Sequence, residues 1–129
     1  MVVDNRTYST ESSHNGNSLI RFRDPASNEL LTGNIISIWV KPIQGRLTTF
    51  FVVRHHTALH PDEEMLAPFH RFHVKYSTRI FAASTNALPR VIEHQNIISH
   101  AVALDRPPGT YGIERRTVVV SWACNRDRR

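Results

Sequence analysis

Short stretches of alternating apolar and polar residues, separated by turn-forming residues, constrain the fold of this chain more than any other feature. In residues 18–23, Ile20 and Phe22 fall on one face of an extended chain, and residues 72–83 alternate in the same way. Successive side chains of a strand point to opposite faces, so alternation is typical of a strand with one buried face. Further strands are predicted at 29–40, 46–55, 98–104 and 116–122. Turns recur about every 8 to 12 residues, which predicts an all-β fold, a small barrel or sandwich.

The segments between these strands carry recognisable turn chemistry. Residues 24–28 (DPASN) predict a tight turn, because proline presets φ and Asp and Asn bond their own backbone. Gly33 is expected to mark a bend or bulge within its strand. Pro61 is followed by three acidic residues, which favours one short helical turn. Residues 91–98 fit either a short 3₁₀ or α turn leading into a strand, and no helix longer than about three turns is expected.

The chain has 129 residues, a common size for one domain. Residues 1–17 are polar and are predicted to be a disordered tail, whereas 18–122 carry the strand pattern and form the β domain. Residues 123–129 are expected to be a basic, frayed C-terminal tail.

The net charge is +5 and the sequence pI about 10.1, which favours anionic partners such as nucleic acid or an acidic protein surface. The alternative is that the charge serves only solubility. There is one cysteine, Cys124, and no apolar run long enough to cross a bilayer. We therefore expect no membrane association and an intracellular location, nuclear or cytoplasmic.

Catalytic and metal-binding patterns are weak. No serine lies in a nucleophile elbow, and the glycines form no phosphate-binding loop, so neither an enzymatic activity nor a cofactor is expected. Histidine and carboxylate residues do gather between positions 55 and 73, where they could supply metal ligands. Their spacing matches no known motif, and we expect no metal there. These residues are His55, His56, His60, His70 and His73, with Asp62, Glu63 and Glu64.

One face of the predicted strand 72–83 is basic. Arg71, His73, Lys75 and Arg79 fall on the face opposite the apolar side chains. A row of cations can follow nucleic-acid phosphates, and Arg115 and Arg116 enter the last predicted strand. We predict a nucleic-acid-binding surface of Arg71, Lys75, Arg79, Arg115 and Arg116. The alternative is an ordinary solvated strand face.

Two stretches resemble SH3-like barrels of the BAH or Tudor kind. Residues 19–40 (LIRFRDPASNELLTGNIISIWV) resemble the opening strand pair of such barrels, and residues 88–104 (LPRVIEHQNIISHAVAL) resemble the segment that leads through a short turn into a late strand. The sequence is also similar to uncharacterised domains found with transposable elements in mushroom-forming fungi. The resemblance implies a module that binds chromatin proteins or nucleic acid.

SH3-like readers hold methylated lysine in a cluster of aromatic rings by cation–π attraction. The candidates here are Trp39, Phe50, Phe51, Tyr76 and Tyr111. Most of these rings are needed for the core of so small a domain. We predict Trp39 and Tyr76 as ligand-binding residues, because their polar atoms favour a partner or water.

Three functional hypotheses follow from the sequence. The first is a non-enzymatic module that binds nucleic acid or a chromatin protein through a basic strand face and an aromatic pocket. The second is a structural or assembly module that dimerises through strand edges. The third is a metal-dependent enzyme that uses the histidine-rich loop.

Overall fold

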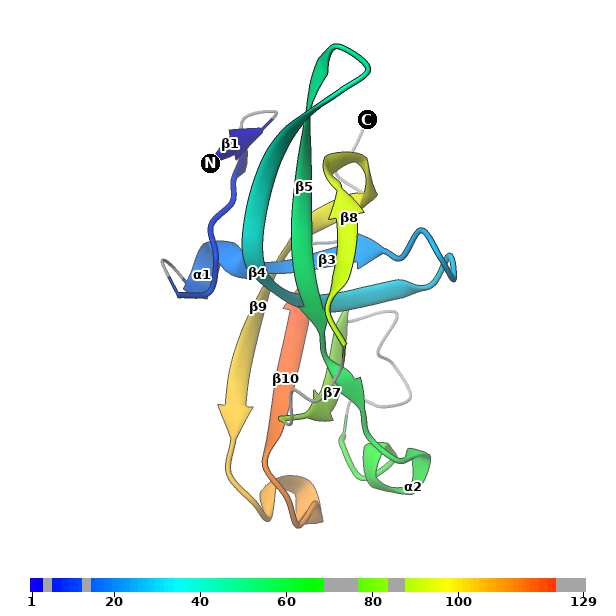
Figure 1. The fold of residues 1–129 in the computed structure, drawn as a ribbon. Helices are drawn as coiled ribbons and strands as arrows, with labels where there is room; N and C mark the ends of the chain where they lie inside the picture. Colours follow the sequence, from blue (N-terminus) through cyan, green and yellow to red (C-terminus); the bar gives the residue numbers. More distant parts are fainter. Residues whose placement is uncertain (4–5, 13–14, 69–76, 84–87, 123–129) are drawn as a thin grey trace.

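The computed structural model describes residues 1–3, 6–12, 15–68, 77–83 and 88–122 (Figure 1). Strands dominate these residues, and the helical segments are single turns, which confirms the predicted all-β fold. The elements in chain order are β1 (Val2–Val3), β2 (Arg6–Thr7), α1 (Asn15–Ser18), β3 (Leu19–Arg23), β4 (Leu30–Ile43), β5 (Arg46–His55), β6 (Thr57–Ala58), α2 (Pro61–Glu64), β7 (Thr78–Ala82), β8 (Arg90–Glu93), η2 (His94–Asn96), β9 (Ile97–Arg106), η3 (Thr110–Gly112) and β10 (Thr117–Trp122).

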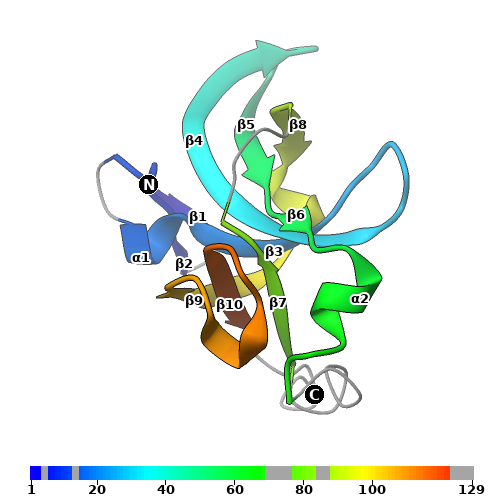
Figure 2. The same cartoon turned by 90° about the horizontal axis from the view of Figure 1, so that it is seen from below.

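The main sheet is antiparallel and curls on itself (Figure 2). Its strand order is β6-β7-β10-β9-β3-β4-β5-β8. A single residue, His56, separates β5 from β6, so the chain passes there from pairing with β4 to pairing with β7. The pairings β3–β4–β5/β6–β7–β10–β9–β3 therefore form a closed ring, and β8 extends the sheet beyond β5.

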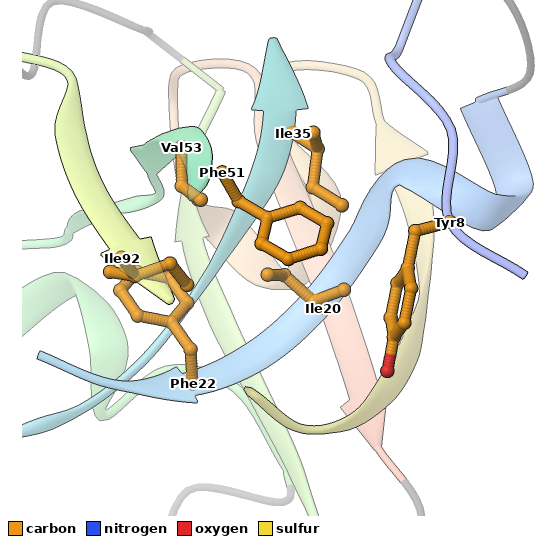
Figure 3. Close-up of a cluster of buried hydrophobic side chains, with 7 residues drawn as sticks. All are labelled: Tyr8, Ile20, Phe22, Ile35, Phe51, Val53 and Ile92. Carbon is orange, nitrogen blue, oxygen red and sulfur yellow. The ribbon is translucent and has the colours of Figure 1, made fainter. Parts of the chain in front are cut away.

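Side chains on both faces of β3 are buried, so this strand lies between two apolar clusters. Ile20 and Phe22 point to one side, where the Phe51 ring of β5 lies next to Ile20 (Figure 3). This first cluster consists of Tyr8, Ile20, Phe22, Ile35, Phe51, Val53 and Ile92. Leu19 points to the other side, into a second cluster inside the ring, formed with Phe81, Ala101, Val118 and Val120.

A third cluster covers the outer face of β7 and β10. It joins Ile80 and Ala82 to Leu59 and Ala67, which flank α2, and to Ile113. The segment around α2 thus packs over one side of the ring. The short helical turn predicted after Pro61 is confirmed, with the His60 imidazole accepting a hydrogen bond from the Asp62 N–H.

β4 is long and bends sharply, and its sequence explains how. The register with β5 shifts between Ile35 and Ser37, which marks a bulge. At Gly33 the strands approach so closely that an added Cβ would lie 2.5 Å from the Arg54 carbonyl oxygen. Gly33 itself pairs in regular register with His55, so the bulge lies after Ile35 and not at Gly33 as predicted. Only glycine fits at position 33, because of this close approach.

The β4–β5 hairpin projects beyond the ring (Figure 1). Its turn residues Gln44 and Gly45 both have positive φ, 51° and 80°, as in the type I′ turn that suits a two-residue hairpin. The strand extends three residues past the predicted end, to Ile43.

The predicted turn at 24–28 is held by the buried Asp24 carboxylate. Its oxygens accept hydrogen bonds from the Ala26 N–H at 3.2 Å and the Ser27 hydroxyl at 2.9 Å, and form an ion pair with Arg90 of β8. Burial alone would raise the pKa of Asp24, but the hydrogen bonds and the Arg90 charge outweigh it and lower the pKa below its ordinary value.

The prediction of a disordered tail over residues 1–17 is wrong for the described part of that segment. β1 and β2 pair with each other, and the Glu11 N–H donates to the Ile35 carbonyl at 2.8 Å. Tyr8 is fully buried, edge-on to Phe51 with ring centroids 5.4 Å apart. A single aromatic residue in a polar segment carries too little periodicity to be recognised from sequence, yet it anchors the segment.

Of the strand predicted at 72–83, residues 78–82 form β7, and residues 72–76 lie outside the described residues. Ser77, directly before β7, has a φ of 52°, a left-handed conformation. In the predicted turn region 91–98, a strand (β8) comes first and a 3₁₀ turn (η2) follows. No helix among the described residues is long and apolar enough to span a membrane.

Candidate functional site

Two of the five cations of the predicted basic surface are paired with acidic residues of α2. Arg79 donates to both carboxylate oxygens of Glu64, at 2.7 and 3.2 Å, and its guanidinium carbon lies 5.2 Å from the centre of the Phe81 ring. Glu64 is buried, which makes this bidentate pair a fixed part of the fold. Arg79 is therefore committed to an internal contact.

Arg115 is held in the same way. Its Nη2 lies 2.8 Å from Glu63 Oε1. Arg116 is exposed and precedes β10, and its carbonyl accepts the Ala83 N–H at 3.1 Å. Arg71 and Lys75 lie outside the described residues. The structure thus pairs two of the five predicted cations with carboxylates, which weakens their attraction for phosphate.

Trp39, by contrast, lies open on the outer face of the β4–β5 hairpin. Its side chain is 53% exposed, and its indole Nε1 donates to the Ser37 hydroxyl at 3.0 Å. Phe50 stands directly opposite Trp39 on β5 and is partly exposed. A cross-strand pair lies on one face of the sheet, so the two rings are neighbours.

These rings belong to an apolar groove of about 430 Å³, which we call the Trp39 groove. Lys41 contributes to it, with its Nζ 5.7 Å from the centre of the Trp39 ring. Arg46 pairs with Ile43 and therefore lies on the same face, at the hairpin end. The groove is lined by Trp39, Lys41, Ile43, Phe50, Val52 and Val91.

Sequence reasoning identified Trp39 but assigned Phe50 to the core. The two-residue turn Gln44-Gly45 could have shown that Phe50 lies beside Trp39. Counting outward from this turn along both strands pairs position 39 with position 50. Val91 could not have been placed, because its pairing with Val52 joins segments far apart in sequence. Tyr76 lies outside the described residues, and Tyr111 lies in η3.

The described histidines do not gather around a metal. His56 is partly buried and stacks on Phe81, with ring centroids 5.4 Å apart, and its Nδ1 lies 2.8 Å from the Thr32 hydroxyl. Burial, with a smaller contribution from His55, lowers the pKa of His56 to about 4. In the described part of the chain, no three His, Cys, Asp or Glu side chains are placed to hold a metal ion. His70 and His73 lie outside it.

No known protein family matches the sequence, and no curated protein or solved structure is significantly similar to it.

Proposed function

We propose that this chain is a non-enzymatic binding module that binds single-stranded nucleic acid in the Trp39 groove. One observation carries the proposal: the exposed Trp39 ring and the partly exposed Phe50 ring lie side by side on the β4–β5 hairpin, beside the Lys41 ammonium. A folded domain gains nothing by exposing an indole to water, so an exposed indole beside a cation favours a ligand with flat rings and negative charge.

The groove offers both kinds of contact that single strands require. Unpaired bases stack on aromatic side chains at about 1–3 kcal/mol per base, whatever their sequence. Lys41 and Arg46 lie along β4 and the hairpin end, where they can neutralise phosphates. An acidic residue on this face, Glu93, stands opposite Phe50 on the β8 side. We therefore place the phosphate backbone along β4 and the bases over Phe50.

A methylated lysine is a poorer candidate for this groove. The Lys41 ammonium already occupies the neighbourhood of the Trp39 ring, and a second cation would be repelled. The resemblance to BAH and Tudor barrels is compatible with nucleic acid as ligand, and within that resemblance we favour nucleic acid over a chromatin protein.

A second function, assembly through strand edges, has one observation in its favour. β9 pairs with β3 only through Ile97–His100, and beyond that point its described pairing is with β10 alone. Val102 and Leu104 on this segment are 68% and 55% exposed. An open edge with apolar side chains can pair with a second copy. A dimer by sedimentation equilibrium, dissociated by Val102→Lys, would favour this function.

The proposed function is tested by fluorescence anisotropy with a labelled oligothymidylate of about 10 nucleotides. We expect the parent chain to bind the single strand more tightly than the corresponding duplex. Trp39→Ala should weaken binding about tenfold, because one stacked base is lost. The fold should persist, since Trp39 is half exposed.

Leu47→Ala is the matched control. Leu47 lies on the same hairpin and is 77% exposed, but it pairs with Pro42 and so faces the opposite side. This variant should bind like the parent. Equal binding by the parent chain and Trp39→Ala would overturn the proposal.

A further inference from the structure

A second pocket, separate from the Trp39 groove, opens where β9 leaves β3. The two strands pair as far as Ile20 and His100, and β9 then continues along β10. The gap leads into the ring of strands and has a volume of about 210 Å³, which exceeds the space that one water needs. Pockets in the mouths of β-barrels are common ligand sites.

The floor of this ring-mouth pocket is apolar and rigid. Leu19 and Val118 line it, and both belong to the buried cluster inside the ring. Asn34 and His56 add polar groups above the floor. Both side chains are fixed: the Asn34 amide donates to the Ser18 hydroxyl at 3.1 Å, and His56 contacts the Thr32 hydroxyl. The shape of the pocket is therefore set before a ligand arrives.

The charged residues that line the pocket are both acidic. Glu11 and Asp105, both exposed, line it, whereas none of its described lining residues is lysine or arginine. Arg54 stands opposite Asn34 on β5 but is not among the lining residues. With a pKa of about 4, His56 is uncharged at neutral pH and does not offset the carboxylates.

We propose that the ring-mouth pocket binds a small organic ammonium ion. The charged head lies between the carboxylates of Glu11 and Asp105, and the apolar stem lies against Leu19 and Val118. An ammonium group brings three hydrogen-bond donors to a site whose acidic side chains only accept. The inference is independent of nucleic-acid binding, because the pocket and the Trp39 groove share no residue.

The test uses the full chain at neutral pH and follows the His56 ring signals by NMR during titration with n-butylammonium. We expect saturable shifts, and much weaker binding of n-butanol and butyrate, which match the stem but lack the positive charge. Glu11→Gln and Asp105→Asn should each weaken n-butylammonium binding about threefold to tenfold. Ala103→Leu, which fills the pocket without changing its charge, should abolish it.

Asp62→Asn serves as the control, because Asp62 is an exposed acid on α2 and does not line the pocket. It should bind n-butylammonium like the parent. Lysine with blocked amino and carboxyl groups shows whether the natural ligand is a lysine side chain of a protein or a free amine. If it binds as tightly as n-butylammonium, the ligand is a protein side chain. If it does not bind, the ligand is a free amine. Absence of saturable shifts, or equal binding of butanol, would overturn the proposal.

Discussion

At the scale of single residues, His56 takes part in closing the ring of strands and also has a shifted pKa. Its backbone N–H donates to the Thr32 carbonyl at 2.8 Å at the point where the chain turns from β4 toward β7. Its ring is partly buried and stacks on Phe81. Burial opposes the protonated form and lowers the pKa of His56 to about 4.

This burial predicts a pH dependence of stability. The pKa of His56 is about 4 in the folded chain and about 6.5 when unfolded, so between these values only the unfolded state takes up the proton. The free energy of unfolding should therefore fall as pH decreases from 6.5 to 4, by up to about 3 kcal/mol, and this contribution should level off below pH 4. Urea unfolding across this range measures it.

His56→Asn keeps a polar atom near Thr32 and removes the titrating ring. The pH profile of this variant should be flatter than that of the parent between pH 4 and 6.5. His60→Asn, a change at an exposed histidine, should leave the profile as in the parent. An unchanged profile in His56→Asn would show that other groups cause the pH dependence.

Single-residue roles were predicted unevenly from sequence. The position of Trp39 outside the core was predicted correctly, because an indole favours a partner or water for its N–H. Arg79 and Arg115 were assigned to a nucleic-acid surface because their acidic partners, Glu64 and Glu63, come from a segment 15 and 52 residues away. Sequence patterns show the face of a strand but not the element that packs beside it.

At the scale of elements, alternation and turn chemistry identified β3, β4, β5, β9 and β10, because both are local properties of the chain. The N-terminal segment was misassigned. Its anchor, Tyr8, stacks on His100 with ring centroids 4.9 Å apart, a contact that spans most of the sequence.

The anchoring of this segment makes a prediction. Tyr8→Ala should lower the free energy of unfolding by about 3–5 kcal/mol, because a fully buried aromatic ring leaves a cavity. Val2→Ala, in the same segment but 67% exposed, should change it by less than about 0.5 kcal/mol. Chemical denaturation measures both. Equally small effects would mean that residues 1–12 do not contribute to the core in solution.

At the scale of the whole molecule, the sequence predicted a small barrel or sandwich but not which strands close the ring. Residues 46–55 were expected to form one strand that ends before a loop, but the chain continues through His56 and pairs with β7. Closure depends on pairings between strands distant in sequence, and the ring-mouth pocket lies between these strands. The same closure leaves the Trp39 groove on the outer face, away from the buried clusters.

The salt dependence of oligothymidylate binding tests the central claim most directly, because it separates stacking from charge. Trp39→Ala should lower the affinity at every salt concentration and leave the slope of log affinity against log salt unchanged. Lys41→Gln should make that slope less negative by about 0.7, the value for one phosphate contact on a single strand. An affinity unaffected by Trp39→Ala, or a slope unaffected by Lys41→Gln, would contradict binding in the Trp39 groove.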